Sequence, residues 1–119
     1  MRATKSTIAD FAARIVGESL SSVTFVQDYV QLRFDGPSFS FFTSVCVRIA
    51  DRVWRPEDCG WRDSLCGRIT HAVRAVWRDD SQMCIDFDDD SSICISLRDE
   101  DYRGPEAVNY IDGERIVVF

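Results

Sequence analysis

Short runs in which apolar and polar residues alternate constrain the fold of this chain more than any other feature. Each run is bounded by turn-forming residues, and the clearest cover residues 23–25, 30–34, 39–49, 83–87 and 93–97. A period of two places successive side chains on opposite faces, so each run predicts a β-strand with one buried face. The short turns between neighbouring runs favour antiparallel hairpins.

Two other segments have the apolar spacing of a helix. Ser6 and Thr7 precede apolar residues at helical intervals up to Val16, which predicts a capped amphipathic helix that ends at Gly17. A second, shorter helix is expected over residues 61–69. The chain is therefore expected to combine a few short helices with a larger amount of sheet.

Two details of the strand pairing follow from the first half of the chain. A two-residue turn at Asp28-Tyr29 would pair Phe25 with Leu32 and place both on one face. Residues 39–49 are expected to form one long strand with a bend or bulge near Phe42-Thr43, where the alternation loses phase.

The order of elements then repeats along the chain. Matching positions are spaced by 50 to 53 residues: Gly17 with Gly67, Val23 with Val73, and Phe34-Asp35 with Phe87-Asp88. Each copy contains a helix, a glycine, a strand, a turn, a strand that ends in Phe-Asp, a turn and a strand. We therefore predict an α+β fold of two tandem αβββ units, residues 6–50 and 59–98, with antiparallel sheets around one core.

The end of the chain adds a further hairpin over residues 107–119. Asp112-Gly113 at its centre is the strongest short hairpin signal in the sequence. The last three residues are apolar and are expected to be held in a sheet. With the two units, this hairpin completes a single predicted domain over residues 1–119.

Composition excludes several classes of protein. The chain has 119 residues, is 45% hydrophobic and carries a net charge of −6, which is typical of one globular domain and not of a disordered chain. A net anion repels a phosphate backbone, so general nucleic-acid binding is not expected. No apolar run is long enough for a membrane span, and no signal-peptide pattern is present, so we expect a cytoplasmic protein without membrane contact.

Five cysteines are present, an odd number with irregular spacing. They are expected to be reduced and mostly buried, and Cys59, Cys66 and His71 lack the close ligand pairs of a structural zinc site. A three-residue turn at residues 88–90 would place Cys84 opposite Cys94 on one face of a hairpin. These two thiols pack if that face is covered, and can oxidise if it is solvated.

Acidic residues are concentrated in one part of the sequence, because ten of the 20 fall between positions 79 and 106. The run from Asp86 resembles the start of a calcium loop, but Ser91 and Leu97 replace the required Gly and Glu, so no metal site is predicted. The acids also suit turns that project from one end of a sheet toward a basic protein. The predicted partner-binding residues are Trp77, as an apolar anchor, with Asp79, Asp80, Asp88, Asp89 and Asp90.

No motif points to catalysis. His71 is the single histidine, and no nucleophile elbow, phosphate-binding loop or dinucleotide fingerprint occurs. The paired carboxylates fall in predicted turns, where water surrounds them. We therefore predict no catalytic residues, no cofactor and no enzymatic activity.

Two stretches, residues 22–36 and 96–107, carry a resemblance. Their sequences, SVTFVQDYVQLRFDG and SLRDEDYRGPEA, resemble hairpin and loop segments of short, uncharacterised bacterial proteins. In size and charge the chain is also similar to immunity proteins, which neutralise a cognate toxin. The resemblance implies a bacterial, cytoplasmic protein that blocks a basic toxin and has no catalytic residues.

Two alternatives to partner docking remain open at this point. One is a homo-oligomeric structural domain, most simply a homodimer, whose sheets pair between copies. The other is a binder of a small ligand between the two repeats.

Overall fold

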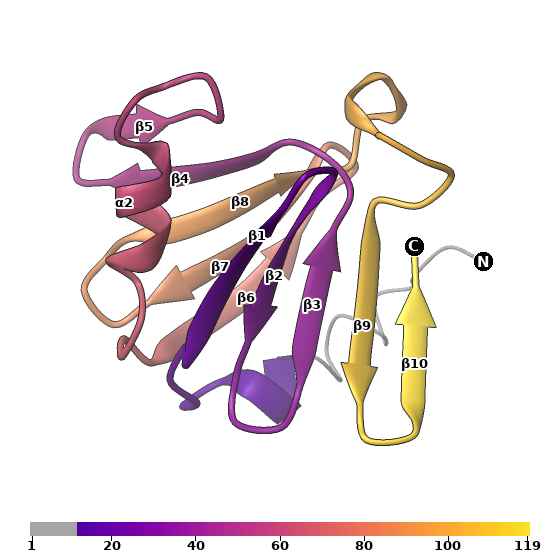
Figure 1. The fold of residues 1–119 in the computed structure, drawn as a ribbon. Coiled ribbons are helices and arrows are strands. Elements are labelled where there is room, and N and C mark those ends of the chain that lie inside the picture. Colours follow the sequence, from indigo (N-terminus) through magenta and orange to yellow (C-terminus); the bar gives the residue numbers. More distant parts are fainter. Residues whose placement is uncertain (1–11) are drawn as a thin grey trace.

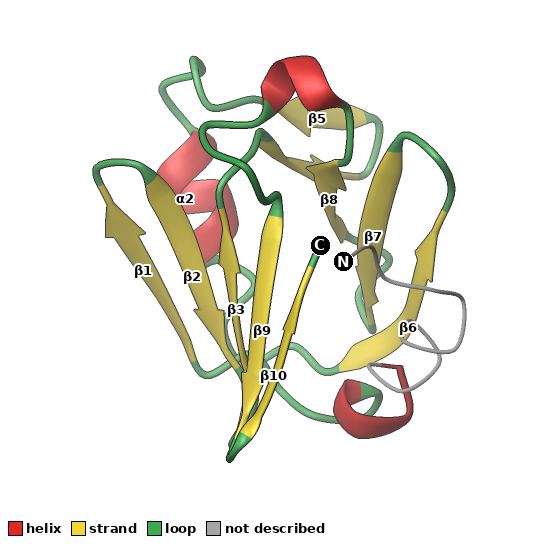
Figure 2. Ribbon diagram, turned by 90° about the vertical axis from the view of Figure 1, so that its right-hand side faces the viewer, coloured by secondary structure: helices red, strands yellow, loops and turns green. Residues whose placement is uncertain are grey.

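The computed structural model describes residues 12–119 and contains two five-stranded antiparallel sheets that face each other (Figures 1 and 2). The first sheet consists, in spatial order, of β1 (Ser22–Val26), β2 (Tyr29–Arg33), β3 (Ser38–Phe41), β9 (Val108–Asp112) and β10 (Arg115–Val118). The second consists of β5 (Arg52–Trp54), β4 (Val45–Ile49), β8 (Ser92–Ser96), β7 (Gln82–Phe87) and β6 (Val73–Arg78).

Helices are few and short. The helix α2 (Trp61–Cys66) packs against β4 and β1, one strand from each sheet, and η1 (Asp99–Asp101) is a single 3-10 turn. Residues 12–15 are helical, and Gly17 follows with a φ of +89°, as expected for a glycine that ends a helix. The start of this predicted helix lies outside the described residues. The small α+β fold with mostly antiparallel sheets agrees with the sequence prediction.

The chain changes sheets between β3 and β4, so the prediction of one bent strand over residues 39–49 is wrong. β3 ends at Phe41 and β4 begins at Val45 in the opposite sheet. The backbone N–H of Phe42 donates to the carbonyl of Ala107, and the hydroxyl of the buried Thr43 donates to the carbonyl of Asp101. These hydrogen bonds give polar groups of the crossing segment partners outside its own strands. The loss of alternation at these residues therefore marks a change of sheet and not a bulge.

The predicted turn positions are shifted, although the buried faces are as expected. Val26 pairs with Tyr29 and Phe25 with Val30, so the first turn is Gln27-Asp28 and Phe25 does not face Leu32. The shift is two residues, and an even shift keeps the same side chains inside. The last hairpin is confirmed as β9 and β10, with Arg115 opposite Asp112 and therefore a turn one residue later than predicted.

One hydrophobic cluster joins the inner faces of both sheets. Its fully buried side chains include Phe39 and Tyr110 from the first sheet and Met83, Ile85 and Ile93 from the second. The second helix is shorter than the predicted 61–69, but it contributes Leu65 to this core. The last residue, Phe119, is also buried, which agrees with the expectation that the end of the chain is held in the fold.

A close contact fixes the start of α2. Trp54 in β5 has the guanidinium carbon of Arg52 at 3.6 Å from its ring centroid. A Cβ atom on Gly60, just before α2, would lie 2.3 Å from Cζ3 of the same ring. Such an overlap is far inside van der Waals contact, and the ring is rigid, so only glycine fits there.

We therefore expect Gly60→Ala to destabilise the protein by about 1–3 kcal/mol, because the ring or the helix start must move. The free energy of unfolding in urea measures this effect. Gly104→Ala is the matched control, since a Cβ there meets no atom within 4 Å. Equal stability of the two variants would contradict the close contact.

Candidate functional site

The acidic turns predicted to act together lie at opposite ends of strand β7. Asp79 and Asp80 occupy the turn between β6 and β7, whereas Asp88, Asp89 and Asp90 occupy the turn between β7 and β8. Successive turns of an antiparallel meander alternate between its ends, and six residues of strand span about 20 Å. The prediction that both turns project from one end of the sheet is therefore wrong.

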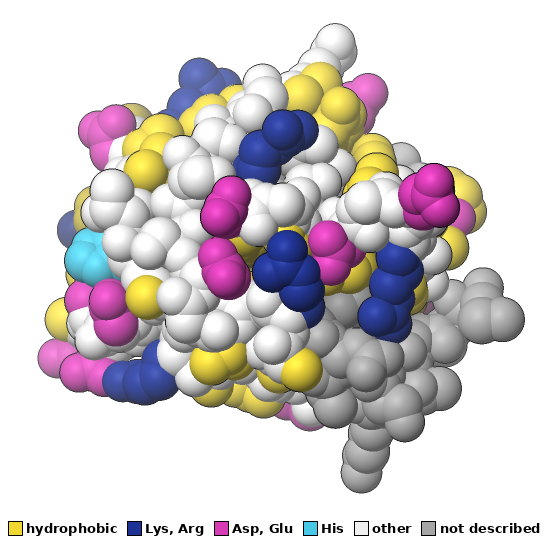
Figure 3. All heavy atoms as spheres, turned by 90° about the horizontal axis from the view of Figure 1, so that it is seen from below, with side chains coloured by type: hydrophobic (Ala, Val, Ile, Leu, Met, Phe, Trp, Pro, Cys, Tyr) yellow, Lys and Arg dark blue, Asp and Glu magenta, His cyan; other side chains and the backbone are white. Residues whose placement is uncertain are grey.

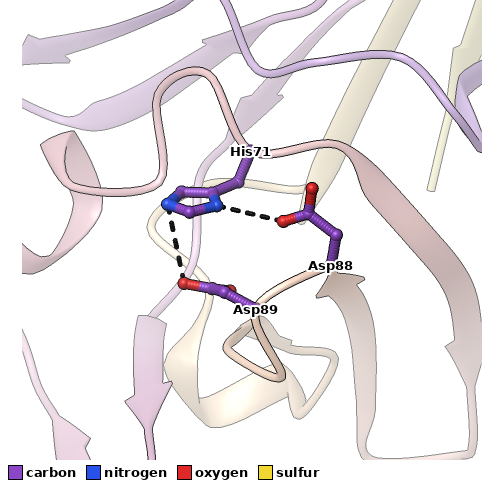
Figure 4. A group of neighbouring side chains, drawn as sticks. All are labelled: His71, Asp88 and Asp89. Carbon is purple, nitrogen blue, oxygen red and sulfur yellow. Dashed lines mark hydrogen bonds and ion pairs between the residues drawn. The ribbon is translucent and has the colours of Figure 1, made fainter.

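The Asp88–Asp90 turn is contacted by one histidine and two arginines. Nδ1 of His71 lies 3.0 Å from Oδ1 of Asp88, as drawn in Figure 4. Arg74 on β6 pairs with Asp90. Seen from below, acidic and basic side chains are intermingled on the surface, with the histidine near one edge (Figure 3). Two of the three carboxylates of this turn, those of Asp89 and Asp90, thus pair with arginines within the chain.

Arg68 is the centre of this cluster and is itself buried, with 7% of its surface exposed. Its Nη1 donates to Oδ2 of Asp89 at 2.6 Å and also to the hydroxyl of Ser91, and its Nε donates to the carbonyl of Ser64 at 3.2 Å. A buried guanidinium needs such partners, because an unpaired buried charge is costly. The sequence gives no signal for this contact, which joins the end of α2 to a turn 21 residues later.

The environment of Asp89 holds its carboxyl in the charged form. Partial burial acts to raise its pKa, but bonds from the side chain and backbone N–H of Ser91, and from Arg68, outweigh burial. Together they lower the pKa of Asp89 from its ordinary value of 3.8 to about 2.

His71, Asp88 and Asp89 bring three ligand atoms within 4.8 Å of one another (Figure 4). One of the two carboxylate oxygens beside the imidazole, Oδ2 of Asp89, already accepts a bond from Arg68. A guanidinium in that position supplies the positive charge that a metal would bring. These contacts therefore link the β7–β8 turn to the loop before β6. That the protein binds no metal remains a prediction.

The other end of β7 is different, and we call it the acidic end. It combines the β6–β7 turn with the segment that follows β8, and its acids are Asp79, Asp80, Asp99, Glu100 and Glu106. A hollow of about 410 Å³ lies here and is lined by three carboxylates, one arginine and two aromatic rings, among others: Asp80, Asp99, Glu106, Arg78, Tyr102 and Phe119.

Within the acidic end, Asp79 shapes its own turn. Its Oδ1 accepts bonds from the backbone N–H groups of Ser81 and Gln82, at 2.8 and 3.0 Å, and from the Ser81 hydroxyl. The bonds from Ser81 are the main cause of a lowered pKa for the exposed Asp79. By contrast, Asp80, Glu100 and Glu106 form no ion pair within residues 12–119.

Trp77 lies on the outer face of the second sheet and not in either turn. The residue is 38% exposed, and its indole N–H donates to Oδ2 of Asp86 at 3.1 Å. The same face carries a groove of about 610 Å³. Besides Trp77, the groove is lined by Cys84 and Cys94, which the strand register had predicted to lie opposite each other. It is also lined by four residues that sequence reasoning did not bring to this pair: Cys46, Arg48, Arg55 and Arg98.

No protein-family model, curated protein or solved structure matches the chain. None of the helices in the described part of the chain is long and apolar enough to cross a membrane.

The lowered pKa of Asp89 leads to a pH-dependent contribution to stability. A carboxyl with a depressed pKa in the folded state stabilises fully above its unfolded pKa, and the contribution is lost as pH falls toward the folded value. Asp89→Asn should therefore reduce the loss of stability between about pH 4 and pH 2.

Urea unfolding across that pH range measures the effect. Ser91→Ala should reduce the loss in part, because it removes one bond to the carboxylate and leaves Arg68 in place. A wild-type pH dependence in both variants would contradict the assignment.

Proposed function

We propose that the protein is a non-enzymatic protein-binding module that docks a basic partner through the acidic end. The observation that carries the proposal is the hollow of about 410 Å³ among Asp80, Asp99 and Glu106. A partner of this kind fits an immunity or antitoxin-like role in the bacterial cytoplasm. In that role the acids occupy a basic groove of the toxin in place of its phosphate-bearing substrate.

The lining of the hollow suits a basic side chain. Carboxylates pair with a guanidinium through charge-assisted hydrogen bonds, and aromatic rings attract cations through their faces. Arg78 already has its guanidinium carbon 5.8 Å from the centroid of the Phe119 ring. Asp80 and Glu106 line the hollow together with that single arginine, so its lining has more carboxylates than cations and can accept a cation from a partner.

The opposite end of β7 supports docking less well. Asp88, Asp89 and Asp90 are paired with His71, Arg68 and Arg74 inside the chain. A partner would have to compete with these side chains for the carboxylates. Of the predicted partner-binding residues, the proposed docking surface therefore keeps Asp79 and Asp80 at the acidic end and leaves out the Asp88–Asp90 turn. Trp77 is an apolar contact on the neighbouring face.

We also propose that the chain consists of two tandem αβββ units. The support is topological, since β1-β2-β3 and β6-β7-β8 are both three-stranded meanders. Each is extended by a hairpin from the other part of the chain, β9-β10 in one sheet and β4-β5 in the other.

A homodimer is the second candidate, and one observation favours it. Ile116 on the edge strand β10 is 65% exposed and pairs with Ile111, which is also exposed. If these residues form a contact between copies, light scattering over a range of concentrations will show a dimer that Ile116→Lys dissociates. A monomer at all concentrations excludes this candidate.

Docking at the acidic end predicts different effects for two equivalent charge reversals. Asp80→Lys should weaken binding of an arginine-rich peptide about fivefold and reduce its salt dependence, because a carboxylate facing the cation is replaced by a like charge. Asp90→Lys changes the net charge equally at the opposite end of β7 and should have a smaller effect. Fluorescence titration at low and physiological ionic strength measures both.

Equal effects of the two reversals would show that the peptide responds only to net charge, and would overturn the docking surface. The toxin-directed role is tested with the product of the adjacent reading frame. The same pair of variants should then change its association rate in the same order.

A further inference from the structure

Three thiols lie in a row across the outer face of the second sheet. Cys46 on β4 pairs with Cys94 on β8, and Cys94 pairs with Cys84 on β7. Trp77 on β6 continues the row beyond Cys84. Their chain neighbours, such as Ile93 and Ile95, point into the core, so the thiols share the opposite face.

Cys84 and Cys94 occupy the kind of strand pair that brings side chains closest. The backbone N–H of Phe87 donates to Ser91, and that of Leu97 donates to Ser81. Because hydrogen-bonded and non-hydrogen-bonded pairs alternate along an antiparallel ladder, Cys84 and Cys94 form a non-hydrogen-bonded pair. In such a pair the Cα atoms lie about 4.5 Å apart, within the range that a disulfide spans.

The two sulfur atoms are in direct contact. Sγ of Cys84 donates to Sγ of Cys94 at a distance of 2.8 Å. This bond is the main cause of a lowered pKa for the Cys94 thiol, to which Arg48 adds while burial and Asp86 oppose it. The same bond, together with burial, raises the pKa of Cys84. Of the two thiols, Cys94 is thus the one that ionises more readily, and Cys84 is the one that donates the hydrogen bond.

The surroundings of Cys94 admit a small anionic molecule. Cys94 is partly exposed and opens into the groove of about 610 Å³, with Arg48, Arg55 and Arg98 on its walls. Within residues 12–119 none of these three arginines forms an ion pair. Cys84, in contrast, is 1% exposed, so an incoming reagent reaches Cys94 first.

We propose that Cys94 and Cys84 form a thiol–disulfide exchange site for an anionic low-molecular-weight disulfide bound in this groove. The inference is independent of docking at the acidic end. It concerns a different face, and it resolves the alternative between packing and oxidation that strand register left open.

The exchange consists of two displacements. The Cys94 thiolate attacks one sulfur of the small disulfide, which forms a mixed disulfide on Cys94 and releases one small thiolate. The Cys84 thiol then gives its proton to the released thiolate or to water and attacks Sγ of Cys94, which expels the second small thiolate. The two protein thiols are oxidised to one disulfide, and the small disulfide is reduced to two thiols.

Cys46 is the third member of the row but has a different role. Burial is the main cause of a raised pKa for its thiol, so it is not the first nucleophile. Cys59 and Cys66 are exposed and lie outside the groove. Their reaction rates therefore show how fast a thiol reacts when it is only exposed and has no groove around it.

The test uses the full chain and glutathione disulfide as the probe, with mass spectrometry of peptides at successive times. Wild-type protein should form the Cys84–Cys94 disulfide. Cys84→Ser should stop at a mixed disulfide on Cys94, and Cys94→Ser should form neither product. Modification at Cys94 should be about tenfold faster than at Cys59 or Cys66.

A second comparison tests the groove without changing a thiol. Arg55→Gln with Arg98→Gln should slow the reaction with glutathione disulfide several-fold and leave the rate with neutral hydroxyethyl disulfide unchanged. The proposal is overturned if Cys59 or Cys66 reacts first, or if Cys84→Ser accumulates no adduct on Cys94. Equal slowing with both reagents would overturn the anion-binding role of the arginines.

Discussion

The pairing of β3 with β9 and of β4 with β8 is the constraint on which the rest of the structure depends. Each pairing joins strands from distant parts of the chain, and each extends a three-stranded meander into a five-stranded sheet. The core is assembled from the inner faces of both sheets. The exchange of hairpins therefore converts two small meanders, each with little apolar surface to bury, into one body with a shared interior.

The same topology determines where the acidic turns, the thiols and Trp77 lie on the surface. Because β7 lies inside a meander, its two turns are at opposite ends, and the acids they carry cannot form one patch. The β7–β8 turn pairs with Arg68, His71 and Arg74. The β6–β7 turn lies beside the segment that leads from β8 back to the first sheet. Between them, the outer face of the sheet aligns side chains from four strands, and this alignment places three thiols and Trp77 in one row.

Much of the sheet content could be predicted because alternation is local. The same argument placed Cys84 opposite Cys94, since the turn at residues 88–90 fixes that register within one hairpin. The change of sheet at residues 42–44 could not be predicted, because it depends on bonds to Ala107 and Asp101, far along the chain. Two further contacts are equally non-local: the ion pair of Arg68 with Asp89, and the pairing of Cys46 with Cys94 on adjacent strands. The sequence pattern therefore did not predict either contact.

The crossing at residues 42–44 has a consequence for how the chain folds. Neither sheet can be completed from one half of the chain. β4 pairs with the adjacent β5, but its other edge remains unpaired until β8 has been added. Contacts of such long sequence separation are slow to form, because loop closure precedes the stabilising contacts. A chain with β1, β2 and β3 in place still exposes the unpaired edge of β3 until β9 arrives. At high concentration the edge of β3 can pair with the β9-β10 hairpin of another molecule. Domain swapping is therefore the form of misassembly that this architecture favours.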